Sequence, residues 1–168
     1  NKKAEYMRFL STQAKDKRPY YHHTEIGYNY RMSNVLAAIG VAQMEVIEDR
    51  IKRTREINEI YRKEVGHLFY SFQEERETDR SNMWLTCALM KGEDKPEDLI
   101  AHLEKDNIEA RRIWKPMHEQ PVMQGYKKYI NGNSSLLFLQ GICLPSGSDL
   151  TNKDMKRIIK SIKTFFNK

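Results

Sequence analysis

The most informative stretch of the chain is His23-Thr24-Glu25-Ile26-Gly27-Tyr28-Asn29-Tyr30-Arg31-Met32-Ser33-Asn34. It is a turn dense in aromatic rings and side-chain donors, and it runs directly into an apolar segment. Gly27 permits backbone angles that are closed to other residues, and Ser33 or Asn34 can cap a helix. Asn29 offers an amide and Arg31 a forked cation, and both suit a phosphate or a carboxylate. The stretch predicts a rigid turn that presents polar groups at a helix start.

A long helix is predicted after this turn, from about Ser33 to about Val65. The first half is small and apolar over residues 35–42, which indicates close packing on more than one side. In the second half one stripe recurs at steps of four and three, and its members are Ile47, Ile51, Thr54, Asn58, Tyr61 and Val65. Acidic and basic residues are mixed between Glu45 and Glu64, as is typical of a solvated helix face.

Strand and helix patterns alternate after the long helix. Strands are expected over residues 67–72, 82–90, 108–113 and 142–144, and the second has an apolar face of Met83, Leu85, Cys87 and Leu89. One helix is expected from Pro96 and another after Thr151, where Asp154 resembles the second half of a capping box. The pattern predicts an α+β fold, in which the long helix leads into a small domain with an antiparallel sheet and flanking helices.

Composition bounds the class of protein. The chain has 168 residues, 39% of them hydrophobic and 31% charged, and no apolar run approaches the roughly 20 residues that span a bilayer. No signal segment opens the chain, so we expect a cytoplasmic protein. The net charge of +6 raises the question of nucleic acid, but the mixed signs argue against it, and an anionic small substrate suits a basic surface better. The opening residues lack an initiator Met, which indicates a cut or processed chain.

Two cysteines, Cys87 and Cys143, have neither metal-type spacing nor the arrangement of a disulfide framework. Each lies in an apolar stretch, so we interpret them as small buried residues in a reducing compartment. His22 and His23 have no partner at zinc-like spacing, and no metal site is expected.

Three motifs, in order, resemble one family. The first is the opening stretch, extended to Leu36-Ala37-Ala38-Ile39-Gly40, which is similar to the G-[YF]-N-x-R-[ML] region of the DegT/DnrJ/EryC1/StrS family. The second is Trp114-Lys115-Pro116-Met117-His118-Glu119-Gln120-Pro121, and the third is Gly141-Ile142-Cys143-Leu144-Pro145-Ser146-Gly147 with Leu150-Thr151. Members are pyridoxal 5′-phosphate-dependent aminotransferases that act on nucleotide-linked keto-sugars. The second motif resembles the subgroup that makes amino-sugars for bacterial polysaccharide or glycoprotein assembly.

The resemblance implies only the C-terminal part of a fold-type I enzyme. Residues 1–32 would be the tail of the large domain with the cofactor-phosphate turn, 33–65 a connecting helix, and 66–168 the small domain. The Schiff-base lysine would lie upstream: Ser71-Phe72-Gln73-Glu74-Glu75 is followed by Arg76, not lysine. No catalytic residue is therefore assigned here, and the fragment alone is expected to be inactive. A dehydratase of the same family, or a non-catalytic basic interaction domain, stays open as an alternative.

The resemblance also implies roles for four residues. Asn29 would reach across a homodimer interface to the cofactor phosphate, and Arg31 would contact that phosphate or the nucleotide-sugar. His118 would lie near the substrate of the adjacent subunit, and Lys115 would lie near substrate phosphates. The partners would be a nucleotide-sugar and glutamate as the amino donor, with neither nucleic acid nor membrane. The alternatives without a binding role are an Asn29 that hydrogen-bonds the backbone of its own turn, an exposed Arg31 beside the helix start, and a His118 held by backbone carbonyls. Trp114 is expected to serve packing more than stacking.

Overall fold

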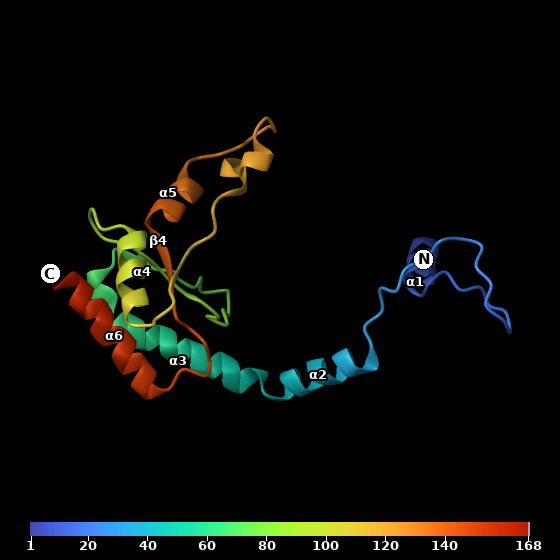
Figure 1. Cartoon of the computed structure of the whole chain (residues 1–168), viewed down its shortest axis with the longest axis horizontal. Coiled ribbons are helices and arrows are strands. Elements are labelled where there is room, and N and C mark those ends of the chain that lie inside the picture. Colours follow the sequence, from blue (N-terminus) through green and yellow to red (C-terminus); the bar gives the residue numbers. More distant parts are fainter. Residues whose placement is uncertain (168) are drawn as a thin grey trace. The chain divides into compact units, whose positions relative to one another are not determined.

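The computed structural model describes residues 1–167, and its contacts divide the chain into two compact units, one up to Ile47 and one from Glu48 onward. The first unit contains helices α1 (Lys2–Ser11) and α2 (Asn34–Glu45). The second contains α3, which begins at Ile47, and the four-stranded sheet with its helices (Figure 1).

The first unit begins with α1, which is followed by a returning loop. The Asn1 side chain accepts a hydrogen bond from the Lys3 amide at the start of α1, and the chain leaves the helix through Gln13 and Ala14, whose φ angles are +68° and +48°. Left-handed angles at two successive residues turn the backbone sharply. The loop then returns and forms an isolated antiparallel bridge between Thr12 and Asn29.

The predicted single helix from Ser33 to Val65 is interrupted at Val46. Ser33 caps α2 as expected, accepting from the Leu36 amide, but α2 ends at Glu45 and α3 (Ile47–Val65) begins two residues later. Between them Val46 has φ −113° and ψ 4°, and its N–H donates to Gln43, three residues back rather than four. Val46 and Ile47 are both β-branched, and such side chains lose rotamer freedom against the preceding turn. The small-residue helix and the charged helix are therefore separate elements.

The sheet of the second unit is antiparallel, as predicted. Its strands are β1 (Ser71–Phe72), β2 (Thr86–Leu89), β3 (Arg111–Arg112) and β4 (Gly141–Leu144), in the order β1-β2-β4-β3. The strands are shorter than the sequence pattern indicated, and the start of the first expected strand is the 3-10 helix η1 (Gly66–Leu68). The α+β fold class is confirmed by this arrangement.

The core lies on one face of the sheet, beneath α3, α4 (Pro96–Lys105) and α6 (Asn152–Phe166). The helix stripe and the amphipathic α6 predicted from spacing both supply it, and the capping box of Thr151 and Asp154 is present. Fully buried members of the core include Ile57, Tyr61, Val65, Leu99, Leu103, Ile142 and Ile162. Four helical and strand segments far apart in the sequence therefore share one apolar cluster.

The apolar face expected for β2 is wrong. Thr86, Ala88 and Met90 point into the core, whereas Cys87 and Leu89 are half-buried on the opposite face. The polar Thr86 is tolerated inside because the Asn58 amide donates to its hydroxyl, with 3.3 Å between Nδ2 and Oγ1. A buried hydroxyl with a partner carries little penalty.

A long excursion joins β3 to β4. It contains the 3-10 helices η2 (Met117–Glu119) and η3 (Pro121–Met123) and then α5 (Asn133–Gln140), and it projects away from the sheet of the second unit (Figure 1). At its base Arg112 pairs in register with Ile142, and the Arg112 guanidinium donates to Glu97 of α4 and to the Phe138 carbonyl of α5. The base of the excursion is thus fixed to the sheet while its tip extends outward.

Candidate functional site

The first part of the candidate site is the turn around Gly27. A Cβ on Gly27 would lie 2.2 Å from both the Ala14 nitrogen and the Gln13 carbonyl carbon, a separation that real Cβ atoms do not reach. Gly27 is not among the residues with positive φ. The expectation that Gly27 supplies a special backbone angle is therefore wrong. Glycine is needed at position 27 because the backbone of Gln13 and Ala14 approaches it closely.

Three backbone hydrogen bonds hold Asn29 in place. Tyr28 donates to Leu10 at 2.8 Å and accepts from Gln13 at 3.0 Å, and Tyr30 donates to Ser11 at 3.1 Å. These bonds flank the Thr12–Asn29 bridge, so Asn29 occupies the position whose own N–H and C=O point away from the partner strand. The Tyr28 and Tyr30 rings stack at 5.2 Å on one side, and the alternation of side chains places Asn29 on the other.

Asn29 and Arg31 are both exposed. Within residues 1–167 neither the Asn29 side-chain amide nor the Arg31 guanidinium has a hydrogen-bonded or ion-paired partner, whether side chain or backbone. The alternative that Asn29 caps its own turn is therefore not realised. An amide and a guanidinium two residues apart, both free, fit the donors that a phosphate requires.

The loop around this turn is braced by ionisable side chains. The Tyr6 hydroxyl donates to Glu25 at 2.5 Å, and this carboxylate raises the pKa of Tyr6. His22 Nδ1 lies 2.6 Å from an Asp16 oxygen, a contact that lowers the pKa of the Asp16 carboxyl. His23 Nδ1 lies 2.9 Å from the Gln13 carbonyl oxygen. The two histidines thus make contacts within the loop, and no three metal-type ligands gather anywhere in residues 1–167.

The second part of the candidate site is the start of the excursion in the second unit. Lys115 is exposed. Trp114 is 65% exposed, and its ring lies 6.0 Å from that of Trp84, so it packs against another surface ring and not in the core. The two tryptophans form an aromatic surface beside Lys115.

His118 is largely enclosed. Its Nε2 lies 3.2 Å from the Ser135 hydroxyl of α5 and 3.6 Å from a Glu119 oxygen. Side chains, not the backbone carbonyls of the alternative, hold the ring. His118 also lines a cavity of about 320 Å³, so part of the imidazole faces a space that a ligand can enter.

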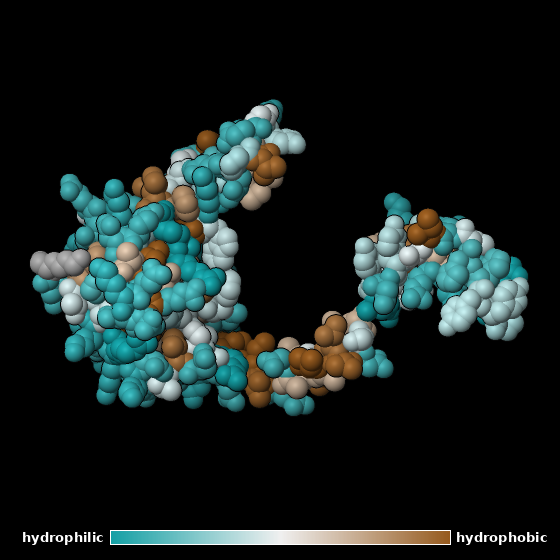
Figure 2. Space-filling model, viewed as in Figure 1, coloured by the Kyte–Doolittle hydropathy of each residue, from teal (hydrophilic) through white to brown (hydrophobic). Residues whose placement is uncertain are grey.

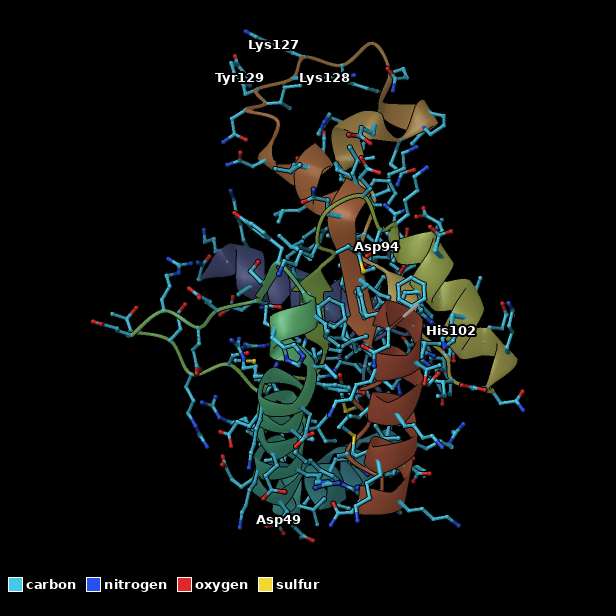
Figure 3. The ribbon with its side chains drawn as sticks, turned by 90° about the vertical axis from the view of Figure 1, so that its left-hand side faces the viewer. Asp49, Asp94, His102, Lys127, Lys128 and Tyr129 are labelled. Carbon is cyan, nitrogen blue, oxygen red and sulfur yellow. The ribbon has the colours of Figure 1, made fainter. Side chains whose placement is uncertain are left out.

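Four further residues that line this cavity were not predicted from the sequence: Tyr126, Lys127, Lys128 and Tyr129. The last three lie at the tip of the excursion in Figure 3. The Lys127 ammonium lies 5.1 Å from the centre of the Tyr129 ring, and Lys128 donates to Gln124 at 3.3 Å. The available signal was the pair of lysines flanked by two tyrosines between Gly125 and Gly132, because rings and cations on an exposed loop suit a planar anionic ligand.

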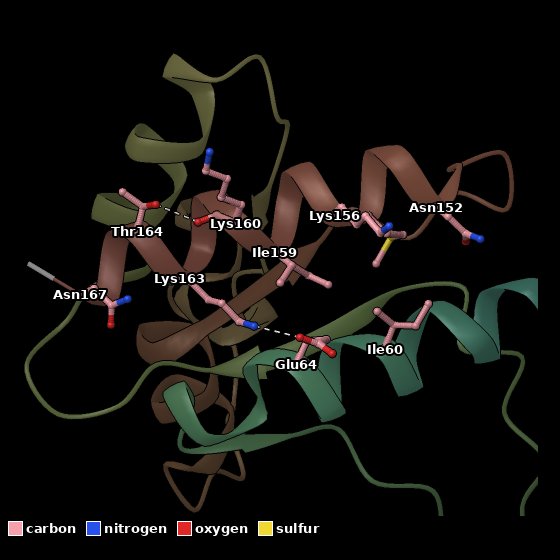
Figure 4. A pocket seen from close by; sticks show the side chains of 10 residues that line it. Ile60, Glu64, Asn152, Lys156, Ile159, Lys160, Lys163, Thr164 and Asn167 are labelled. Carbon is pink, nitrogen blue, oxygen red and sulfur yellow. Dashed lines mark hydrogen bonds and ion pairs between the residues drawn. The ribbon is translucent and has the colours of Figure 1, made fainter.

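A further cavity of about 690 Å³ lies between α3 and α6 (Figure 4). Its floor is apolar and its rim carries lysines, one of which, Lys163, pairs with Glu64 at 2.9 Å. None of the predicted site residues lines this cavity, neither Asn29 and Arg31 nor Lys115 and His118. No helix within residues 1–167 has the length and apolar character to cross a membrane.

Comparison with known proteins gives consistent similarities. The DegT/DnrJ/EryC1/StrS aminotransferase family matches residues 1–163. The chain is 39% identical, over 97% of its length, to Bacillus subtilis EpsN, which is assigned as a pyridoxal phosphate-dependent aminotransferase. It is 36% identical, over 88% of its length, to the GDP-perosamine synthase of Escherichia coli O157:H7.

A crystal structure of a DegT DnrJ EryC1 StrS aminotransferase from Brucella abortus has the same fold. It superposes with a TM-score of 0.79 over 98% of this chain, at 23% identity. This chain spans 43% of EpsN, 40% of the perosamine synthase and 44% of the Brucella protein. The ordered motifs, the fold and the family match agree, and the chain belongs to the DegT/DnrJ/EryC1/StrS aminotransferase family.

Proposed function

We propose that this chain is the C-terminal part of a pyridoxal 5′-phosphate-dependent aminotransferase that acts on a keto-sugar linked to a nucleotide, with glutamate as the amino donor. The family match and the similarity to EpsN and to GDP-perosamine synthase support the reaction class. The observation that carries the proposal is the Asn29 amide, held rigidly by the Gly27 turn and without an internal partner. We place the reaction in the cytoplasm, as a step in amino-sugar synthesis for a surface glycan.

In this proposal Asn29 and Arg31 hold the cofactor phosphate. The Asn29 amide and the Arg31 guanidinium would donate hydrogen bonds to the phosphate, and the guanidinium would add a positive charge. When bound, the cofactor supplies an electron sink for the transfer of the amino group. The lysine that carries it belongs to the part of the enzyme that precedes this chain, so residues 1–168 by themselves would be inactive.

Lys115 and His118 bind the substrate in this proposal. The Lys115 ammonium is exposed and free to meet a phosphate, and the His118 ring faces the cavity next to Lys127 and Lys128. A sugar-nucleotide carries two phosphates, and a cavity with two lysines and two tyrosines suits a charged, planar ligand. These residues bind and orient the substrate while the chemistry takes place at the cofactor.

The active site is shared between two subunits of a homodimer in this proposal. Support comes from α2, which directly follows the turn and has no buried residue. Its large apolar side chains are exposed by more than half, and Figure 2 shows them as hydrophobic surface; they include Val35, Leu36, Ile39, Val41 and Met44. A helix that is apolar on several sides requires a covering surface.

Hybrid dimers of the full-length enzyme test this arrangement. Asn29→Ala removes a hydrogen bond to a charged group, worth about 1.5–3 kcal/mol, and should weaken cofactor binding about 10- to 100-fold. A second variant replaces the cofactor lysine. If Asn29 serves the neighbouring subunit, mixing the two variants at a cofactor concentration too low to saturate Asn29→Ala restores activity, because one site of each hybrid has both residues intact. If Asn29 serves its own subunit, no hybrid has an intact site and mixing restores nothing, which would overturn the shared site.

A further inference from the structure

Cys87 and Cys143 are the two cysteines of the chain, and the structure brings them together. They are direct partners in the register of β2 and β4, and their Sγ atoms lie 3.6 Å apart. Both are free thiols. This pairing could not be predicted from the sequence, because 56 residues separate the two positions and only the sheet register relates them.

The type of strand pair matters for what these thiols can do. The Met90 N–H donates to the Gln140 carbonyl at 2.8 Å, which marks that pair as hydrogen-bonded. Hydrogen-bonded and non-hydrogen-bonded pairs alternate along an antiparallel ladder. The Cys87–Cys143 pair lies three residue pairs along this ladder from Met90–Gln140, so it is a non-hydrogen-bonded pair. In such pairs the side chains approach most closely and the Cα atoms are about 4.5 Å apart. A disulfide spans Cα separations of about 4.4–6.8 Å, so the bond needs no large movement of the backbone.

The thiols are also within reach of a small reagent. Both lie on the sheet face opposite the helices; Cys87 is half-buried and lines a cavity of about 380 Å³ together with Trp114 and Leu137. Cys143 is 6% exposed and lines a neighbouring cavity of about 330 Å³, also beside Trp114. The hydrogen bond between the thiols lowers the pKa of Cys143, against the effect of burial, and raises that of Cys87. Cys143 is therefore the more readily ionised thiol of the pair.

We propose that Cys87 and Cys143 form a reversible dithiol–disulfide site, oxidised by hydroperoxides such as hydrogen peroxide and restored by thiols. The Cys143 thiolate attacks one peroxide oxygen, the O–O bond breaks, and hydroxide leaves with a sulfenic acid formed on Cys143. The Cys87 sulfur then attacks the Cys143 sulfur, the S–O bond breaks, and water leaves as the disulfide forms. The hydroxide takes up the proton first lost from Cys143. Two thiols are oxidised by two electrons in total, and one peroxide is reduced to two waters.

The site is independent of the proposed aminotransferase activity and is tested by peptide mapping of the full-length protein. After treatment with hydrogen peroxide, remaining thiols are blocked with N-ethylmaleimide and the protein is digested with trypsin. The expected product links the peptide 81–91, which contains Cys87, to the peptide 129–153, which contains Cys143. Dithiothreitol should return both peptides to the alkylatable form.

Two variants serve as controls. Cys87→Ser leaves a sulfenic acid on Cys143 that dimedone traps, whereas the wild-type protein gives the linked peptide and little dimedone adduct. Cys143→Ser removes the attacking sulfur and should slow peroxide consumption at Cys87. Mixing ¹⁵N-labelled with unlabelled protein separates a bond within one chain from a bond between chains. The proposal is overturned if the linked peptide combines labelled and unlabelled halves, or if wild-type cysteines pass to sulfinic acid without any linked peptide.

Discussion

Gly27 lies against the backbone of Ala14, so closely that a Cβ on residue 27 would meet the Ala14 nitrogen at 2.2 Å. Ala14 is fully buried and has a left-handed φ of +48°. The close approach joins the exit of α1 to the segment that carries Asn29. The conformation of the candidate phosphate-binding residue therefore depends on the absence of a single carbon atom.

Gly27→Ala should displace this segment and weaken cofactor binding. The clash is with backbone, which has no flexible side-chain end to move aside, so the bonds at Tyr28 and Tyr30 must open. We expect retention of pyridoxal phosphate by the full-length enzyme, followed by absorbance after dialysis, to fall at least as far as for Asn29→Ala.

The matched control for this change is Gly66→Ala. Gly66 begins η1 in the second unit, and a Cβ there would meet nothing within 4 Å. Alanine loses less conformational freedom than glycine on folding, so this variant should retain the cofactor fully. Equal losses in both variants would show that the Gly27–Ala14 contact is not specific to the site.

The lysines at the tip of the excursion should affect substrate binding. Each exposed charge pair is worth about 1 kcal/mol at close range in water, so Lys127→Gln with Lys128→Gln should raise the KM for a sugar-nucleotide by about 10-fold or more and leave kcat nearly unchanged. The effect should shrink as salt is added. Steady-state kinetics at two ionic strengths measure both expectations.

Lys156→Gln with Lys160→Gln removes the same charge from α6, where both lysines line the other cavity. This variant should keep the wild-type KM. If it raises the KM as much as the double change at the tip, net charge and not the His118 cavity determines substrate affinity.

Glu75 should govern part of the stability at low pH. Its two oxygens accept from the Arg55 guanidinium at 3.0 and 2.8 Å, and this interaction, with the Ser81 amide, lowers the Glu75 pKa to about 2. The unfolded chain binds the proton more readily, near pH 4.3. The contribution is therefore complete above that pH and is lost as the pH falls toward 2. Urea midpoints measured from pH 6 to pH 2.5 should decline less steeply in Glu75→Gln.

Glu74→Gln is the neighbouring control, since Glu74 makes no ion pair within the part of the chain that the structure describes. Its midpoints should follow the wild-type slope. A Glu75→Gln curve parallel to that of the wild type would show that the Arg55 pair does not contribute to acid stability.

Tyr61 connects α3 to the segment after β4. Its fully buried ring donates from the hydroxyl to the Pro145 carbonyl at 2.8 Å. Tyr61→Phe leaves that carbonyl without its partner and should lower the free energy of unfolding by about 1–2 kcal/mol. Tyr70→Phe, at a 73% exposed ring, should change it by less than about 0.5 kcal/mol.

The same variant has a pH signature. Burial raises the pKa of Tyr61, so the unfolded chain loses the phenolic proton first, near pH 10. Wild-type stability should therefore fall as the pH rises beyond about 10, and Tyr61→Phe should remove this part of the decline. Chemical unfolding at pH 8 and at pH 10.5 distinguishes the two proteins.

Local signals predicted the helices of the core well. The spacing of Ile158, Ile162 and Phe165, with the Thr151 cap, defines α6, because a helix face and its cap are encoded within a few residues. The predicted stripe through Asn58 and Tyr61 likewise faces the core. Such patterns depend on residues close together in the chain, so they can be recognised without knowing which surface the helix packs against.

Features set by distant partners escaped prediction. The prediction places Cys87 on the core face of β2, but Ala88 lies there. Both faces of this strand carry apolar residues, so the packing of the helices determines which face is buried. The break at Val46 and the close approach at Gly27 likewise depend on backbone positions that no spacing rule reports. For Asn29, the sequence indicated a good donor, and only the hydrogen-bond pattern showed that the amide is free.

The pairing of Arg112 with Ile142 closes the excursion at its base. Everything from Trp114 to Gln140 leaves and re-enters the sheet between two adjacent strands, so insertions or deletions there need not alter the register or the core. Under the proposed function, the residues that contact the substrate can therefore differ among relatives without refolding the domain that carries them. Changes of substrate preference would then be insulated from selection on stability.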